Sequence, residues 1–199
     1  MQTTPASRPD TNTGKLIVLS GPGGVGKTTV AQRLWEEIPD FQRAVTATTR
    51  AKRDGEVDGE DYFFLSEDEF KRRIDSDEFL EYAYVYDKDW YGTPKGSTLA
   101  AVAAGKTVLL VIDVQGGVQI KQQFPEARLI FMLPPSLEEL RRRLEARGKD
   151  NPDAIVARLK KAVAEIDIGE QKYDTTIVND DLDVAVEELK RRITDVWHS

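Results

Sequence analysis

The sequence predicts an α/β fold with three layers, in which helices cover both faces of a parallel β-sheet. Four short apolar runs, at residues 16–19, 107–112, 128–133 and 175–178, have the length and composition of buried strands. Segments with helical spacing separate them, and this alternation is typical of a parallel sheet. Ligands of such sheets bind beyond the carboxyl ends of the strands, so the residues that follow these runs are candidates for a site.

Length and composition narrow the possible functions. The 199 residues, 40% of them hydrophobic, suit one domain at 14–199 after a polar tail at 1–13 that we expect to be disordered. A formal charge of −7 argues against a nucleic-acid partner. Cysteine is absent and the one histidine is His198, so thiolate chemistry is excluded and a catalytic histidine nearly so. With no membrane-length apolar stretch and no secretory leader, we expect a soluble, cytoplasmic protein without a membrane partner.

The first strand leads into a glycine-rich loop. Residues 21–28 fit the phosphate-loop pattern G-x-x-x-x-G-K-[ST], and helical spacing begins after Thr28. Glycines let backbone N–H groups converge on an anion at a helix N-terminus. Lys27 can reach the β- and γ-phosphates, and the Thr28 hydroxyl can ligate Mg²⁺. A glycine turn without a ligand would not need this lysine and threonine in register, so the sequence predicts a triphosphate site. Its expected residues are Gly21, Pro22, Gly23, Gly24, Val25, Gly26, Lys27, Thr28 and Thr29.

Residues 46–93 have β-type patterning and predict an inserted lobe. We expect strands at 43–49, 62–65 and 79–86, and a helix opened by the capping box Ser66–Glu69. Most of the acidic side chains in this lobe are expected on a solvated surface.

The remaining helices follow from capping signals and periodicity. A helix is expected at 94–104, and a second excursion contains helices that begin at the capping box Ser136–Glu139 and at Asn151-Pro152. The apolar stripe of the latter is expected at Ile155, Val156, Leu159, Val163 and Ile166. The final helix, 182–197, is expected to pack through Ala185, Leu189, Ile193 and Val196.

Arginines on the two excursions suggest that two phosphates are held from opposite sides. Arg50 and Arg53 lie in the lobe, whereas Arg143, Arg147 and Arg158 lie in the helical excursion. Arginine stabilises the charge that phosphoryl transfer spreads over oxygen atoms. A phosphate acceptor is already anionic and needs no base, which fits a chain without a usable histidine. An aspartate or glutamate base remains an alternative.

These residues carry a resemblance to the guanylate kinase family of P-loop nucleoside monophosphate kinases, from Lys15 to about Ile193. Beyond the phosphate loop, the supporting blocks are Thr-Thr-Arg-Ala-Lys-Arg-Asp-Gly-Glu-Val-Asp-Gly at 48–59, Asp-Tyr-Phe-Phe at 61–64, Phe-Leu-Glu-Tyr-Ala at 79–83, Tyr-Gly-Thr at 91–93, Ile-Asp-Val-Gln-Gly at 112–116, Arg-Leu-Glu-Ala-Arg-Gly at 143–148 and Ile-Val-Asn-Asp-Asp at 177–181.

The resemblance implies transfer of the γ-phosphoryl group of MgATP to GMP, and to dGMP, giving ADP and GDP in purine nucleotide metabolism. It implies ATP, GMP and Mg²⁺ as ligands, and we expect a monomer or small homo-oligomer. The implied parts are a P-loop kinase core at 14–45, 94–134 and 168–199, a mixed-β GMP-binding lobe at 46–93 and a helical lid at 135–167.

Site residues are carried over position by position. The resemblance assigns catalysis to Lys27, Arg50, Arg143, Arg147 and Arg158. It places Asn179 near adenine and Thr28 and Asp113 at Mg²⁺. It assigns GMP to Thr46, Arg50, Arg53, Tyr62, Glu81, Tyr91, Thr93 and Asp113. The chemistry agrees, because a carboxylate such as Glu81 can accept hydrogen bonds from both N1–H and the exocyclic amine of guanine. Adenine has an acceptor at N1 and does not present this pair of donors.

Some positions depart from the family pattern. Gly23 and Val111 stand where a serine and an acid are usual, so a metal role at that strand end rests on Asp113 alone. Thr46 and Thr93 replace serines and keep the hydroxyl. Two other functions remain open: an interaction module that has lost activity, although Lys27 is retained, and a kinase acting on a phosphorylated sugar. A GTPase is less favoured, since no Asn-Lys-x-Asp sequence is present.

Overall fold

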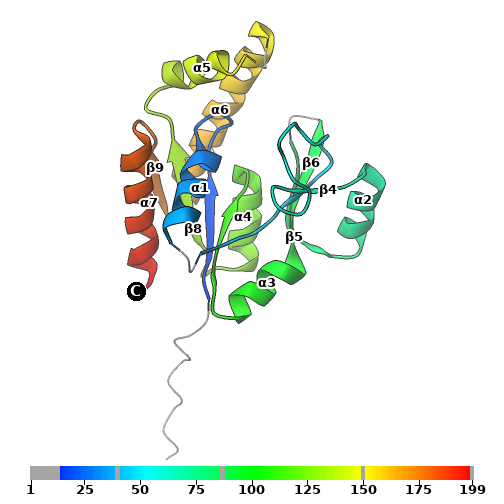
Figure 1. Cartoon of the computed structure of the whole chain (residues 1–199). Helices are drawn as coiled ribbons and strands as arrows, with labels where there is room; N and C mark the ends of the chain where they lie inside the picture. Colours follow the sequence, from blue (N-terminus) through cyan, green and yellow to red (C-terminus); the bar gives the residue numbers. More distant parts are fainter. Residues whose placement is uncertain (1–13, 39–40, 86–87, 149–150, 198–199) are drawn as a thin grey trace, which may run out of the picture.

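A five-stranded parallel sheet forms the centre of the protein, in the order β2-β7-β1-β8-β9 (Figure 1). The computed structural model describes residues 14–38, 41–85, 88–148 and 151–197, so the tail expected at 1–13 and His198 lie outside the described residues. The strands are β1 (Leu16–Ser20), β2 (Phe41–Arg43), β7 (Thr107–Val111), β8 (Arg128–Leu133) and β9 (Thr175–Val178). Every pairing between them is parallel, which confirms the predicted class of sheet.

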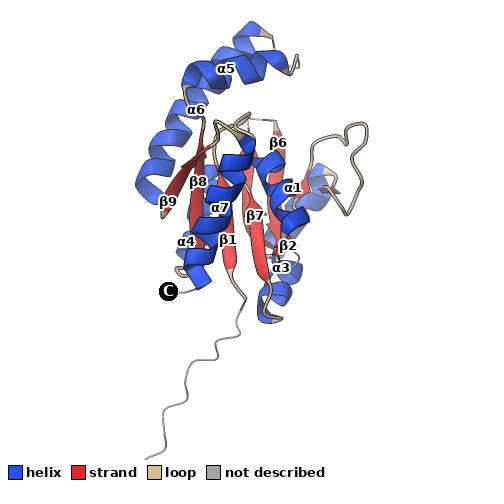
Figure 2. Ribbon diagram, turned by 60° about the vertical axis from the view of Figure 1, so that its left-hand side comes forward, coloured by secondary structure: helices blue, strands red, loops and turns tan. Residues whose placement is uncertain are grey.

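Side chains of β1 alternate between two cores, because successive strand residues point to opposite faces of the sheet. Ile17 and Leu19 belong to one core, and Leu16 and Val18 to the other. The helices that cover the first core are α1 (Lys27–Glu37) and α7 (Leu182–Trp197), and those of the second are α3 (Lys95–Ala103), α4 (Val114–Gln123) and α6 (Pro152–Lys172). Figure 2 shows α7 and α1 in front of the sheet and α4 behind it. The three-layer arrangement is therefore confirmed.

The inserted lobe has a sheet of its own, in the order β4-β3-β6-β5. Its elements are β3 (Ala47–Thr48), β4 (Phe63–Phe64), α2 (Glu67–Asp75), β5 (Phe79–Val85) and β6 (Asp89–Pro94). The sheet is mixed, because β3 and β4 run parallel and the other pairs antiparallel. A separate core holds it together, with Phe70 of α2 stacked on Phe79 at 4.5 Å between ring centroids.

The helical excursion consists of α5 (Leu137–Ala146) and the first half of α6. Both start where the capping signals predict: Ser136 Oγ accepts from the Glu139 N–H at 3.0 Å, and Asn151 Oδ1 from the Ala154 N–H at 2.8 Å. The two helices pack through a small core of their own, with Leu140, Leu144, Ile155 and Ala162. Among the described helices, none combines the length and the apolar composition needed to cross a bilayer.

Several local expectations are wrong or incomplete. The single strand expected at 43–49 is two strands, since the chain leaves the central sheet after β2 and enters the lobe at β3. β6 and α4 were not predicted, because each contains glycines that weaken the strand or helix signal. On α6, Val156 and Val163 are exposed by 44% and 43%. Ile155 of the expected stripe is buried, and Leu159 and Ile166 pack against the cores as expected. The other buried residues of α6 are Ala162, Glu165 and Gly169, and positions 155, 162 and 169 follow a seven-residue spacing.

Gly169 allows α6 to approach the central sheet. A Cβ atom at this position would overlap the ring of Phe131, which is fully buried on β8. The close approach fixes the second half of α6 on the sheet, while its first half extends into the lid (Figure 1).

We expect Gly169→Ala to reduce the free energy of unfolding by about 1–3 kcal/mol, the usual cost of overpacking a core. Gly96→Ala in α3 is the matched control, because its added Cβ meets nothing within 4 Å. Helix propensity predicts a neutral or slightly stabilising effect there. Urea unfolding of both variants measures the difference, and equal stabilities would contradict the packing argument.

Candidate active site

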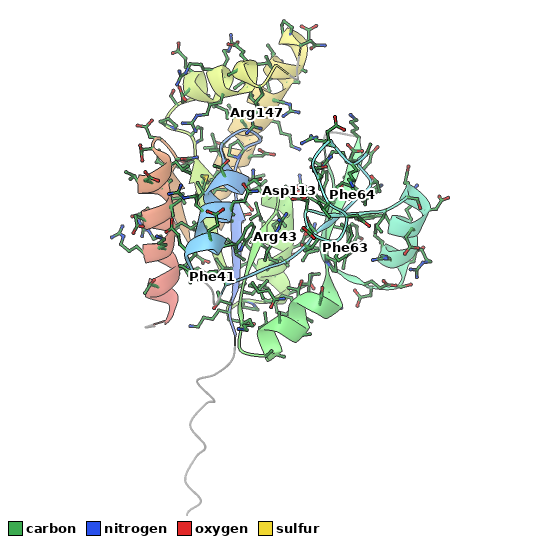
Figure 3. All side chains as sticks on the ribbon, viewed as in Figure 1. Phe41, Arg43, Phe63, Phe64, Asp113 and Arg147 are labelled. Atoms are coloured by element: carbon green, nitrogen blue, oxygen red, sulfur yellow. The ribbon has the colours of Figure 1, made fainter. Side chains whose placement is uncertain are left out.

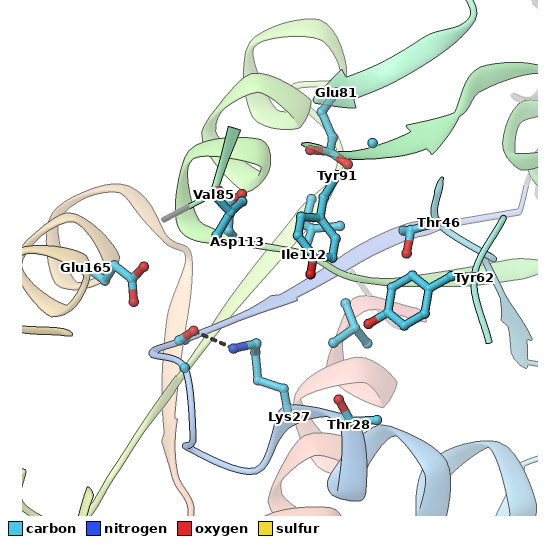
Figure 4. A pocket seen from close by; sticks show the side chains of 14 residues that line it. Lys27, Thr28, Thr46, Tyr62, Glu81, Val85, Tyr91, Ile112, Asp113 and Glu165 are labelled. Carbon is cyan, nitrogen blue, oxygen red and sulfur yellow. Dashed lines mark hydrogen bonds between the residues drawn. The ribbon is translucent and has the colours of Figure 1, made fainter. Parts of the chain in front are cut away.

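The glycine loop, the lobe and α6 meet in one pocket at the carboxyl ends of β1 and β7 (Figure 4). The loop contributes Gly21, Gly23, Lys27 and Thr28, the lobe contributes Thr46, Tyr62, Glu81 and Tyr91, and the remaining polar side chains are Asp113 and Glu165. Figure 3 shows Asp113 at this edge of the sheet, between the lid that carries Arg147 and the lobe that carries Phe64. The pocket thus joins four of the residues expected to bind ATP with five of those expected to bind GMP.

Residues at the end of the central sheet contact the glycine loop and stabilise its conformation. Gly26 has φ = 102°, and a side chain there would overlap the amide of Asn179. That amide donates to the Val25 carbonyl oxygen at 2.7 Å, and Asn179 is almost fully buried. Arg143 donates to the Asn179 carbonyl oxygen at 2.9 Å. The loop conformation is therefore held by Arg143 of α5 and by Asn179, which follows β9, and the phosphate-loop pattern contains neither residue.

The Lys27 side chain folds back onto the glycine loop. Its Nζ donates to the carbonyl oxygens of Gly21 at 2.6 Å and Pro22 at 3.2 Å. Burial of the ammonium group lowers the pKa of Lys27 to about 8, although the carboxylates of Glu165 and Asp113 act in the opposite direction. An enclosed ammonium group with two carbonyl partners can exchange them for phosphate oxygens.

Glu81 lies at the opposite side of the pocket, on β5. It is 3% exposed and accepts a hydrogen bond from Thr93 Oγ1 at 2.6 Å. Burial raises the pKa of Glu81 to about 8. Gly116 of α4 makes room for the carboxyl group, because a Cβ there would overlap Glu81 Oε2. Glu81 lines the same pocket as Thr46, and a buried carboxyl group in such a pocket is suited to recognise adjacent N–H donors.

Neighbouring side chains fix the orientation of the Arg50 guanidinium group. It forms a two-pronged ion pair with Glu56, with nitrogen–oxygen distances of 3.0 and 2.8 Å. Its guanidinium group lies over the rings of Tyr62 and Phe64, 5.3 and 5.6 Å from their centroids. These contacts fix the guanidinium plane, so little entropy would be lost when it binds a phosphate.

A second, wider cleft adjoins the pocket and has basic side chains on both walls. Its lining from the lobe includes Arg50, Arg53 and Lys88, and its lining from the lid includes Arg147, Arg158 and Lys161. The sequence prediction that arginines on two separate excursions face each other agrees with this arrangement. Such a concentration of positive charge favours a polyanion between lobe and lid.

Other candidate residues have structural partners. Arg143 does not line either cleft and donates to backbone oxygens and to Glu139 at 2.8 Å. The amide of Asn179 donates its hydrogen bond to the loop, and the Thr93 hydroxyl donates to the Glu81 carboxyl group. Asp113 is the N-cap of α4, with Oδ1 accepting from the N–H groups of Gln115 and Gly116 at 2.7 and 3.0 Å. Thr29 is exposed at the start of α1.

Sequence reasoning missed Glu165 and Lys161. Both lie on α6, and they form an ion pair at 3.7 Å. Glu165 lines the pocket with Lys27, whereas Lys161 lines the wider cleft. The seven-residue spacing of Ile155, Ala162 and Gly169 was the available signal, because it places Glu165 on the buried face of the helix.

Comparison with known proteins identifies the family. A sequence model of guanylate kinases matches residues 13–196. A guanylate kinase from Caldanaerobacter subterraneus subsp. tengcongensis is 49% identical over 177 residues, which are 89% of this chain and 85% of that protein. One from Synechocystis is 48% identical over 180 residues, covering 90% and 93%. The crystal structure of guanylate kinase from Anaplasma phagocytophilum superposes with a TM-score of 0.79 at 35% identity, covering 94% of this chain and 88% of that one. By sequence and by fold alike, this chain belongs to the guanylate kinase family.

Proposed function

We propose that this chain transfers the γ-phosphoryl group of MgATP to GMP, and also to dGMP, producing ADP and the corresponding diphosphate. The observation that carries the proposal is one pocket that is lined on one side by Lys27 of the glycine loop and on the other by the buried carboxyl group of Glu81. The first feature suits a triphosphate and the second a guanine edge. Family membership supports the same reaction.

The loop and the lid would hold ATP. Backbone N–H groups of residues 23–28 would surround the β-phosphate at the start of α1, where the helix dipole favours an anion. Lys27 would move from the Gly21 and Pro22 oxygens to the γ-phosphate. Arg147 and Arg158 line the cleft above the loop and would neutralise charge as the phosphoryl group leaves.

The lobe would hold GMP. Arg50 and Arg53, with the hydroxyl groups of Tyr62 and Tyr91, would bind its phosphate. Glu81 would accept from N1–H and the exocyclic amine of guanine, and Thr46 would donate to O6. A base that lacks those donors leaves the buried carboxyl group unpaired, which can reject it by about 10⁴-fold.

The donor set fits Mg²⁺ bound together with a triphosphate. Thr28 and Asp113 line the same pocket and offer the oxygen ligands that Mg²⁺ prefers. The described residues contain no group of three or more acidic, histidine or cysteine side chains able to hold a metal alone. Phosphate oxygens and water would therefore complete the coordination, and the bound ion would neutralise the transferred phosphoryl group.

The alternatives have less support. An inactive interaction module would not need the enclosed Lys27 or basic residues on both walls of the cleft. A kinase for a phosphorylated sugar would not need Glu81 buried opposite the loop. We retain a monomer or small homo-oligomer in the cytoplasm, without nucleic-acid or membrane partners, as part of the proposal.

A coupled assay of ADP formation over GMP, dGMP, AMP, CMP and UMP tests the reaction. GMP should have the highest kcat/KM, followed by dGMP. A preference for AMP would refute the assignment of Glu81 to guanine, and turnover of no monophosphate would refute the reaction.

We expect Glu81→Gln to raise the KM for GMP by about 100-fold, because the amide replaces one acceptor by a donor. The ratio of kcat/KM for GMP over AMP should fall. Glu78→Gln is the control, since Glu78 lies just before β5 and is exposed. An unchanged KM for GMP in the Glu81 variant would show that this carboxyl group does not contact the base.

The same substitution should stabilise the ligand-free protein above neutral pH. The pKa of Glu81 is raised from about 4.5 to about 8, so the folded state binds more protons than the unfolded state between these values. Its contribution to stability therefore falls as pH rises from about 4.5 to 8. Melting temperatures of the wild type and Glu81→Gln at pH 5 and pH 8 measure this. The advantage of the variant should be larger at pH 8, and an equal difference at both pH values would contradict the burial argument.

A further inference from the structure

Side chains of helix α4 are bonded to one edge of strand β5. The strand lies at the end of the lobe sheet, with β6 along its other edge. The amide oxygen of Gln119 accepts from the Tyr82 N–H at 3.3 Å, and its amide nitrogen donates to the Tyr82 carbonyl oxygen at 3.1 Å. Gln123, one turn further along α4, donates to the Leu80 carbonyl oxygen at 2.8 Å. Helix side chains therefore take the place that a neighbouring strand would have.

These hydrogen bonds fix the backbone on both sides of Glu81. The Leu80 carbonyl group belongs to the peptide unit that precedes Glu81, and the Tyr82 N–H belongs to the unit that follows it. The angles φ and ψ of Glu81 are the rotations of these two planar units about its Cα atom. Because both units are bonded to α4, the helix sets the direction in which the Glu81 side chain leaves the strand.

The strand is irregular at this point. The register of β5 against β6 shifts between Phe79 and Glu81. Phe79 packs in the core of the lobe, whereas Leu80 packs in the core that α4 covers on the central sheet. Glu81, the next residue, is buried and lines the pocket. An irregularity of this kind disrupts the ladder locally, so contacts from outside the sheet are needed to fix the backbone at Glu81.

One face of α4 serves both the backbone and the carboxyl group of Glu81. Gly116, Gln119 and Gln123 are separated by three and four residues, which places them on the same face of the helix. A Cβ atom at Gly116 would overlap Glu81 Oε2. The face that donates and accepts the hydrogen bonds therefore also leaves the space for the carboxyl group.

We propose that Gln119 and Gln123 are positioning residues for recognition of the guanine base. They hold the two peptide units beside Glu81, so that its carboxyl group is directed to the N–H donors of the base. This inference rests on the proposed phosphoryl transfer to GMP.

Gln119→Met tests the proposal, because methionine has nearly the length and helix propensity of glutamine but lacks the amide group. We expect the KM for GMP to rise about fivefold, which corresponds to the usual contribution of one hydrogen bond. The value of kcat and the KM for ATP should change by less than about twofold. Steady-state kinetics with GMP and ATP varied in turn measure all three.

Gln123→Met should raise the KM for GMP in the same way, through loss of the bond to the Leu80 carbonyl oxygen. Gln123 is exposed, so this second variant keeps the test available if Gln119→Met does not fold. Gln122→Met is the matched control, since Gln122 is exposed on the same helix, and it should leave the KM unchanged. A wild-type KM for GMP in the folded Gln119 or Gln123 variants would overturn the proposal.

Double-mutant cycles separate the positioning of Glu81 from a general role in holding the lobe. In the Glu81→Gln background, Gln119→Met should change kcat/KM for GMP by less than about twofold. In the Arg53→Ala background, which removes a phosphate contact instead of a base contact, the effect of about fivefold should remain. If Gln119 only held the lobe against the core, both backgrounds would give the same factor, and the proposal would be wrong.

The two proposals fail in distinguishable ways. If the wild type phosphorylates no monophosphate, the proposed function fails. If Glu81→Gln raises the KM for GMP but both glutamine variants retain the wild-type value, recognition of guanine by Glu81 stands and its positioning by α4 fails.

Discussion

The enclosed ammonium group of Lys27 is the constraint on which the rest of the site depends. Burial lowers its pKa to about 8, so the protein holds a charge there that water would stabilise better. Two loop carbonyl oxygens accept its hydrogen bonds, and the loop itself is fixed by the amide of Asn179. The parallel sheet makes this possible, because β1, β7, β8 and β9 all end at the same edge and deliver their following residues to one place.

On the acceptor side, a buried carboxyl group is the corresponding feature. Glu81 is buried against Thr93, in space left by Gly116, and its pKa is raised to about 8. Burial therefore disfavours the charged form of both groups, and a bound nucleotide would offer each of them further hydrogen-bond partners. Burial of Lys27 and Glu81 lowers the stability of the fold, and nucleotide binding would offset that loss. Such a trade is common for groups that act on ligands.

The central fold could be predicted because each signal was local. Apolar runs identified β7, β8 and β9, and the capping residues Ser136 and Asn151 identified the starts of α5 and α6. The phosphate loop could also be recognised from the sequence, because its pattern lies within eight consecutive residues. The partition of residues 43–49 between two sheets was not predictable, since it depends on strands far along the chain. Glu165 was also missed, because its burial is indicated only by the seven-residue spacing of Ile155, Ala162 and Gly169 and not by its own residue type. The guanine-reading role of Glu81 came from family resemblance, and pattern alone would have favoured a surface carboxylate.

A structure of the protein with GMP and a non-hydrolysable ATP analogue tests the central claim most directly. We expect the triphosphate on residues 21–28 with Lys27 withdrawn from the Gly21 and Pro22 oxygens, and the Watson–Crick edge of guanine against Glu81 with O6 near Thr46. Lys27 still bonded to both loop carbonyl oxygens, or guanine lying away from Glu81 and Thr46, would contradict the account.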